Sequence, residues 1–126
     1  NTDLIGKTPE ERAETRMWTR RVDLQIVEPM TTGFRYSEGL ELFKSRMQTI
    51  PDAADGLKSI AQEKIAWLDG EMEDKDYICG NRFTLADVML FCFLNFGATV
   101  GQTVSEENLN IISWYDRVKE RSSTAA

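Results

Sequence analysis

The chain has 126 residues, enough for one domain with a substantial hydrophobic core. Its net charge of -6 argues against nucleic-acid binding, and the lack of histidine excludes histidine-based catalytic triads and most catalytic zinc sites. No apolar run approaches the roughly 18 residues of a membrane-spanning helix, so we expect no membrane span.

The first predicted helix begins at Pro9, after a linker end in residues 1–7. Thr8 can cap this helix, Pro9 suits the first helical position, and Glu11 can reach back to complete a capping box. Apolar residues then recur at helical spacings as far as Met30. Pro29 should kink or end the helix, because its ring removes a backbone donor.

The middle of the chain contains a connector and then a clearer helix. Residues 36–49 form the connector, which could contain a short helix around residues 40–47. Between Leu57 and Met72, apolar residues lie three or four apart, which predicts an amphipathic helix. The acidic run at residues 71–76 lacks the ligand spacing of a calcium loop. We interpret it as a solvated turn and expect no metal site.

The strongest structural signal lies in residues 84–96. Thr84 can cap a helix, and the carboxylate of Asp87, at the third helical position, can accept the Thr84 N–H, which makes a second capping box. Between Leu85 and Phe96 only Asp87 and Asn95 are polar. This composition predicts a helix that is buried on all sides.

The two cysteines indicate a reducing compartment, and neither is expected to be a reactive thiol. Cys92, in the apolar helix, is expected to be buried, whereas Cys79, nearer a turn, is expected to be partly exposed. Arg82 is only a weak basic neighbour for activating a thiol. Two cysteines do not make a disulfide framework, so we expect a reducing, cytoplasmic setting.

The last segment predicts one more helix. Gly97 and Gly101 are expected to end or loosen the apolar helix, so that residues 95–102 form a turn region. Residues 105–108 are expected to cap a final helix with an inward face from Ile111 to Val118. Residues 122–126 should fray. No segment alternates polar and apolar residues over the length of a strand. We therefore predict a single all-α domain over residues 1–126, a bundle of about five helices.

Two segments resemble the C-terminal domain of glutathione S-transferases, of bacterial type. Residues 80–87, Gly-Asn-Arg-Phe-Thr-Leu-Ala-Asp, are similar to that domain's G-x-x-F-[ST]-x-A-D signature. Residues 110–118 resemble the family's later helix, which often ends in W-Y-x-R. The resemblance implies an orthogonal helical bundle whose first helix runs on toward Phe34. It also implies an N-terminal thioredoxin-like domain that is absent from this chain, which begins with Asn1 instead of methionine.

The resemblance also implies a function in detoxification. The full-length protein would join glutathione to a hydrophobic electrophile, and this chain would supply the substrate wall and a homodimer interface. Hydrophobic substrates would lie near Met30 and Phe34, and Asp23 would bind the α-amino group of glutathione. No catalytic residue is expected here, so the segment alone should be inactive. A salt bridge from Asp23 to Arg16 or Arg20 is the competing interpretation.

Other interpretations stay open. Met30 and Phe34 could be ordinary core residues. The same helical fold could also serve as a non-catalytic protein-interaction module, as in translation-factor or synthetase assemblies, or as a stand-alone scaffold. A thioredoxin-like domain upstream would favour the enzyme.

Overall fold

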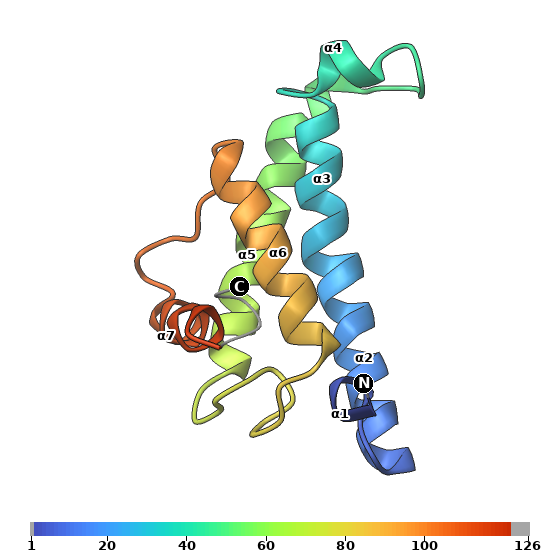
Figure 1. Ribbon diagram of the computed structural model, residues 1–126. Helices are drawn as coiled ribbons and strands as arrows, with labels where there is room; N and C mark the ends of the chain where they lie inside the picture. The colour runs from blue at the N-terminus through green and yellow to red at the C-terminus, as the bar shows by residue number, and fades with distance from the viewer. Residues whose placement is uncertain (1, 122–126) are drawn as a thin grey trace.

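The computed structural model describes residues 2–121, and within that range it contains helices and no strands (Figure 1). The expected frayed tail, residues 122–126, lies outside the described residues. Two isolated β-bridges, in the turn at residues 77–82, are the only extended pairing in the described part of the chain. The helices are α1 (Thr2–Ile5), α2 (Pro9–Val22), α3 (Glu28–Arg35), α4 (Leu40–Phe43), α5 (Ala54–Glu71), α6 (Leu85–Thr99) and α7 (Leu109–Lys119).

Helices α2 and α3 form one long column, joined by a π-helical turn at Asp23–Val27 (Figure 1). Pro29 has no N–H to donate, and an unbroken α-helix would leave a carbonyl unpaired at this point. The chain widens just before the proline, so the Glu28 N–H bonds to the Asp23 carbonyl five residues earlier. The helix therefore continues to Arg35 instead of ending at Pro29.

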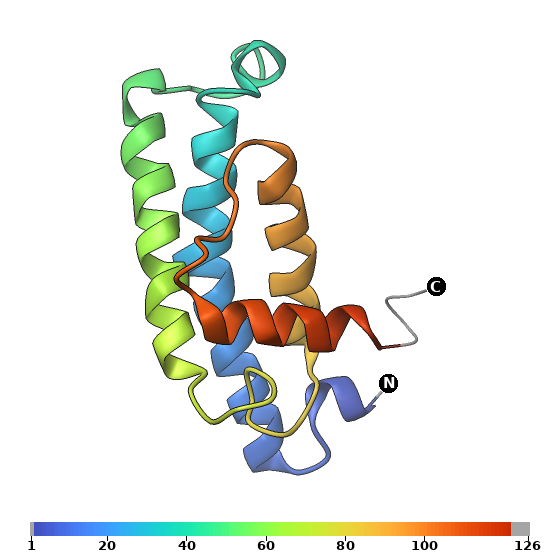
Figure 2. The ribbon, with the colours of Figure 1, turned by 90° about the vertical axis from the view of Figure 1, so that its left-hand side faces the viewer.

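The long column packs beside α5 and α6, and α7 crosses the bundle nearly at right angles (Figure 2). This arrangement confirms the predicted all-α orthogonal bundle. The buried apolar side chains that meet between these helices are Trp18, Val22, Ile26, Val27, Met30, Ala61, Ile65, Leu68, Met72, Ile78, Cys79, Ala86, Leu90, Leu94, Ile111, Trp114 and Val118.

The capping box at the start of α6 is present, as the sequence predicted. Asp87 Oδ2 accepts the Thr84 N–H at 2.8 Å, and Thr84 Oγ1 accepts the Ala86 N–H at 3.2 Å. Asp87 Oδ1 also accepts the Ile78 N–H at 3.0 Å and the Trp114 indole N–H at 2.8 Å. One buried carboxylate thus holds the turn before α6, the start of α6 and α7 together.

The prediction that α6 is buried on every side was wrong. Leu85 and Val88 are 40% and 36% exposed, and Cys92 is exposed beside them. These residues share one face of the helix, which the described part of the chain leaves uncovered. Cys79, expected to be partly exposed, is buried with its Sγ 3.5 Å from Thr84 Oγ1.

The end of α6 also differs from the prediction. Gly97 lies inside the helix, which continues to Thr99. A Cβ at Gly97 would lie 3.0 Å from Met30 Cε and 2.9 Å from the Gln102 carbonyl oxygen. Glycine is needed here for close packing of α6 against α3, and it does not stop the helix.

Within residues 2–121 no helix is both long and apolar enough to cross a bilayer. Over the same residues, no three histidine, cysteine, aspartate or glutamate side chains gather as metal ligands would.

Candidate functional site

The end of α3 presents an aromatic corner built around Phe34. The Phe34 ring meets Phe96 of α6 edge-on at 5.1 Å between centroids and meets Phe43 of α4 edge-on at 6.3 Å. All three rings are only partly buried. The guanidinium carbons of Arg35 and Arg46 lie 5.9 and 6.0 Å from the Phe43 centroid. This corner therefore offers apolar ring surface with a cationic rim, which suits an aromatic or apolar molecule.

Met30, the second residue expected in the substrate wall, lies one turn earlier and is fully buried. Its side chain fills the gap over Gly97, and its carbonyl accepts the Gln102 Nε2–H at 3.0 Å. Met30 supports the aromatic corner from inside the bundle and presents no surface to solvent in this chain.

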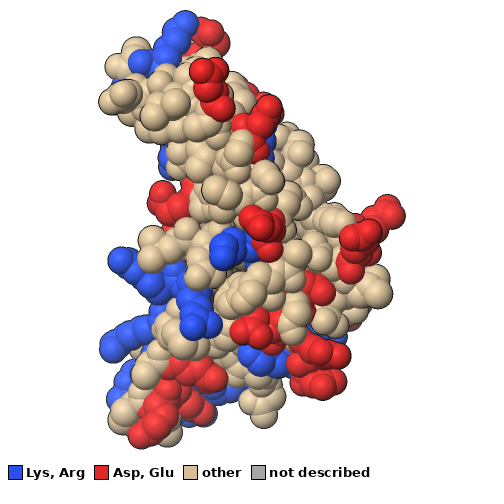
Figure 3. Space-filling model, turned by 180° about the vertical axis from the view of Figure 1, so that it is seen from behind, with Lys and Arg blue, Asp and Glu red and all other residues tan. Residues whose placement is uncertain are grey.

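Asp23 lines a groove of about 340 Å³ along α2. The other residues that line this groove, called the α2 groove below, are Ile5, Arg12, Thr15, Arg16, Thr19, Arg20 and Leu85. Arg12, Arg16 and Arg20 recur every four residues, so they lie in one row along the helix. Seen from behind, Lys and Arg side chains gather along the edge of the molecule where α2 lies (Figure 3).

Asp23, Arg16 and Arg20 of the α2 groove form no ion pair in the described part of the chain, while Arg12 donates to the Lys7 carbonyl at 3.2 Å. The competing salt bridge from Asp23 to Arg16 or Arg20 is therefore not formed. Thr15 and Thr19 use their hydroxyl protons on the carbonyls of Glu11 and Thr15. In a protein of net charge -6, this row of guanidinium groups is a local positive field.

Asp23 lies where α2 meets the π-helical turn, and its spacing of three from Arg20 and seven from Arg16 brings it to the α2 groove. Asp23 is the first residue of that turn, and its carbonyl accepts the Glu28 N–H. Leu24, the next residue, points about 100° away from Asp23 around the helix and lies exposed. Such π-helical turns are rare, and they occur frequently at functional sites.

Sequence reasoning missed several residues of these sites. Phe43 was not considered for the substrate wall, and Phe96 was left open as core or pocket lining, because only the fold brings α4 and α6 against Phe34. Arg12 was also missed, although its spacing of four from Arg16 was a usable signal. Arg21 does not belong to this row of arginines. Its guanidinium carbon lies 5.2 and 5.7 Å from the ring centroids of Trp18 and Trp67.

Two buried titratable groups, those of Asp87 and Cys79, serve structure. Burial raises the pKa of Asp87, while its hydrogen bonds to Ile78, Thr84 and Trp114 oppose the rise. Burial likewise raises the pKa of the Cys79 thiol, which keeps it protonated and poorly nucleophilic. Neither group reaches the aromatic corner or lines the α2 groove.

Comparison with known proteins adds to this geometry. Residues 42–122 match the family model described as the C-terminal domain of glutathione S-transferase. Glutathione S-transferase 2 of Saccharomyces cerevisiae is 27% identical over 125 residues, covering 95% of this chain and 52% of that protein. Elongation factor 1-gamma of Homo sapiens is 29% identical over 94 residues, covering 75% of this chain and 20% of that protein.

Two solved structures share the fold closely. Gtt2 from Saccharomyces cerevisiae has a TM-score of 0.88 at 26% identity, covering 98% of this chain and 59% of that one. A glutathione S-transferase domain-containing protein from Marinobacter aquaeolei has a TM-score of 0.86 at 26% identity, covering 96% of this chain and 59% of that one. The chain thus spans about half the length of the yeast transferase and a fifth of the elongation factor.

Proposed function

The chain belongs to the glutathione S-transferase C-terminal domain family, and from this premise we propose that it forms the hydrophobic-substrate wall of a glutathione transferase. The observation that carries the proposal is the aromatic corner at the end of α3, where Phe34 meets Phe43 and Phe96. An electrophile with an apolar body would lie against these rings. The glutathione thiolate would attack its electrophilic carbon, and the new carbon–sulfur bond would form as the bond to a leaving group, such as a halide, breaks and that group departs with the electron pair.

The α2 groove supports a contribution to glutathione binding. Glutathione carries one ammonium group and two carboxylates, and the groove offers the Asp23 carboxylate beside the row of Arg12, Arg16 and Arg20. The carboxylate would hold the α-amino group, and a guanidinium would hold a carboxylate through paired hydrogen bonds. The group that activates the thiol belongs, in this proposal, to a thioredoxin-like domain outside this chain.

Two exposed apolar surfaces are suited to contacts with the thioredoxin-like domain and with a second copy of the chain. The α6 face of Leu85, Val88 and Cys92 is the surface that the thioredoxin-like domain would cover. Met17 and Leu24 are 41% and 51% exposed on the outer side of the long column, where a second copy would pack in a homodimer. Both cysteines are free, which fits a reducing, cytoplasmic setting.

The test uses a protein that joins this chain to its thioredoxin-like domain. Phe34→Ala should raise the KM for a hydrophobic electrophile about tenfold or more while glutathione affinity changes less than about twofold, because of the two ligands only the electrophile would lie against this ring. Ile60→Ala, which truncates an exposed apolar side chain on α5, is the matched control. An equal loss for both ligands, or lower stability with unchanged KM, would assign Phe34 to the core.

The 126-residue chain and the joined protein also test which domain carries the catalytic group. The 126-residue chain alone should show no conjugation above background, because it lacks a group to stabilise the glutathione thiolate. Asp23→Asn in the joined protein should weaken glutathione binding, with no effect on the electrophile. Turnover by the pure 126-residue chain would place the catalytic machinery in this half.

The similarity to elongation factor 1-gamma favours a second candidate, a non-catalytic interaction module. The two candidates differ in a simple measurement. A joined protein that binds neither glutathione nor a hydrophobic electrophile, and that co-purifies with a defined protein partner, would support the module.

A further inference from the structure

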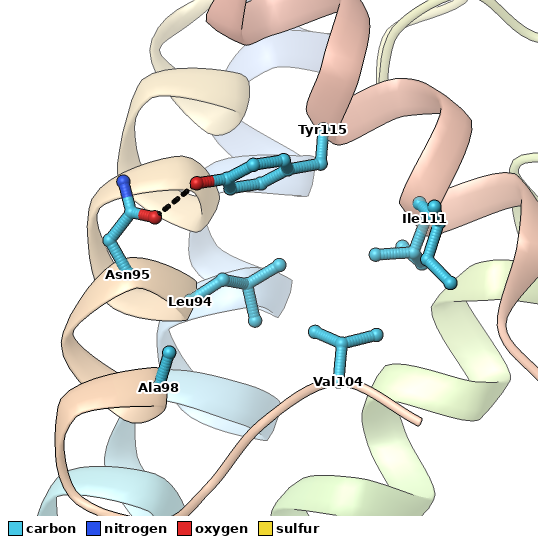
Figure 4. Close-up of a pocket in the computed structure, with 7 residues that line it drawn as sticks. Leu94, Asn95, Ala98, Val104, Ile111 and Tyr115 are labelled. Carbon is cyan, nitrogen blue, oxygen red and sulfur yellow. Dashed lines mark hydrogen bonds between the residues drawn. The ribbon is translucent and has the colours of Figure 1, made fainter. Parts of the chain in front are cut away.

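A separate cavity of about 200 Å³ lies between α6 and α7, and nothing in the proposed function uses it. We refer to it as the α6–α7 cavity. Leu94, Ala98, Val104 and Ile111 point their side chains into one shared space below the Tyr115 ring (Figure 4). We propose that this cavity binds a small, neutral, mostly apolar molecule that carries one hydrogen-bond donor, such as a phenol.

The lining excludes charged ligands and disfavours water. Its aliphatic side chains come from α6, from α7 and from the loop between them, and no charged residue lines it. A water molecule needs two to four polar partners to be held well, and most of this wall offers none. An apolar ring in the cavity would gain contacts with Leu94 and Ile111, which are themselves buried.

One end of the cavity is polar, and it offers a ligand a hydrogen-bond acceptor. The Tyr115 hydroxyl donates its proton to Asn95 Oδ1 at 2.6 Å (Figure 4). Since that proton is committed, the Tyr115 oxygen offers only lone pairs to a ligand, which must therefore supply the donor. The Tyr115 ring stacks on Phe91 at 4.9 Å between centroids, so the acceptor is held in place before any ligand arrives.

The volume limits the size of the ligand. An enclosed apolar cavity of about 150 Å³ is known to admit benzene, and the α6–α7 cavity differs in opening to solvent beside Asn95, Ala98 and Ile112. The α6–α7 cavity, at about 200 Å³, has room for one six-membered ring and a short substituent. Larger fused-ring compounds would protrude past Ile112, which is partly exposed and also lines the cavity.

The cavity lies on a different side of α6 from the aromatic corner. Asn95 lines the cavity and Phe96 contacts Phe34, and successive residues of a helix point about 100° apart. The two sites can therefore be altered separately. Failure of the transferase proposal would leave this one standing, and the reverse is also true.

Titration of the 126-residue chain with phenol and with toluene, followed by NMR shifts of the cavity methyl groups, tests the proposal. Both should bind saturably, with phenol about three- to tenfold tighter because it alone donates to Tyr115. Tyr115→Phe should bring the two affinities together. Ala98→Leu should fill the cavity and weaken both ligands at least tenfold, whereas Ala66→Leu, at an exposed site on α5, should change neither.

Three results would overturn the proposal. The first is the absence of saturable shifts up to the solubility limit of phenol. The second is a phenol preference that survives Tyr115→Phe. The third comes from the protein joined to its thioredoxin-like domain: loss of phenol binding there, restored in the 126-residue chain, would show that a protein side chain occupies the cavity. Retained phenol binding in the joined protein supports a small-molecule site.

Discussion

The indole N–H of Trp114 donates to Asp87 Oδ1 at 2.8 Å, and neither side chain has any exposed surface. This bond joins the start of α6 to the middle of α7, which are 27 residues apart in the chain. An ionised carboxylate is costly to bury, and its donors from the Ile78 N–H, the Thr84 N–H and Trp114 offset that cost. Removing any one donor should therefore destabilise the fold.

Trp114→Phe and Asp87→Asn should show strong coupling. Each single change should lower the free energy of unfolding by about 1–3 kcal/mol, because it leaves a buried partner unsatisfied. The double mutant should lose less than the sum of the two, since the second change removes a group that has already lost its partner. Urea denaturation of all four proteins measures this, and additive losses would contradict a direct energetic link.

The two threonine caps should differ in their contribution to stability. Thr84→Ala leaves the Ala86 N–H unpaired in a buried place, and we expect a cost near the upper end of about 0.5–2 kcal/mol. Thr8→Ala is the matched control, because Thr8 Oγ1 caps α2 where water can replace it. The midpoints of denaturant unfolding check the order. Equal midpoints for the two variants would show that burial of the α6 cap contributes nothing.

Two helical glycines should respond in opposite directions to replacement by alanine. Gly97→Ala should destabilise, since the new Cβ would lie 2.9 Å from the Gln102 carbonyl oxygen, a backbone atom that cannot easily move. Gly56→Ala, in α5 with no atom within 4 Å of the new Cβ, should stabilise by about 0.4–1 kcal/mol. Thermal unfolding of both variants tests this. A Gly97→Ala protein as stable as the parent would refute the close packing of α3 on α6.

Glu38 should make stability depend on acid pH. The hydrogen bond from Lys58, at 2.8 Å, and that from Ser37 lower the pKa of Glu38 from 4.5 to about 2. A carboxylate with a lowered pKa contributes stability above its unfolded value, and that contribution is lost as the pH falls from about 4.5 through about 2. The contribution is modest because the side chain is partly exposed.

The measurement for Glu38 is a pair of denaturation series. The difference in unfolding midpoint between the parent and Glu38→Gln should be constant above about pH 5 and should shrink toward pH 2. Glu41→Gln removes the ion pair between Glu41 of α4 and Lys44, the residue after that helix, and serves as the control. A difference that is independent of pH would mean that the Lys58 bond does not bias the ionisation of Glu38.

Much of the fold could be predicted from capping residues and from the spacing of apolar residues. Thr8 with Pro9 marked the start of α2, and Thr84 with Asp87 marked the start of α6, because caps are recognised within four residues of sequence. The spacing of apolar residues from Leu57 to Met72 predicted α5. Ile60, one of the apolar residues at this spacing, is exposed, because the apolar stripe is broader than the surface that α3 covers.

The candidate sites were less readable. The sequence placed Phe34 near the end of the first helix, but Phe43 and Phe96 join it only when α4 and α6 fold against α3. Asp23 was recognised as a candidate, whereas its groove with Leu85 and Ile5 depends on packing between α1, α2 and α6. The α6–α7 cavity was not predicted at all, since it exists only where two crossing helices fail to fill the space between them.

The sequence by itself determined most of the longer helices, the caps of α2 and α6 and the family, because those depend on residue types at short, fixed spacings. It missed α1, which lies in residues interpreted as the end of a linker. Tertiary structure decided which faces are covered. Cys92 and Cys79 exchanged their expected environments, since an apolar helix is buried only where another element reaches it, and a turn is buried wherever a helix packs over it. Burial of a side chain is set by neighbours distant in sequence, and no local pattern specifies those neighbours.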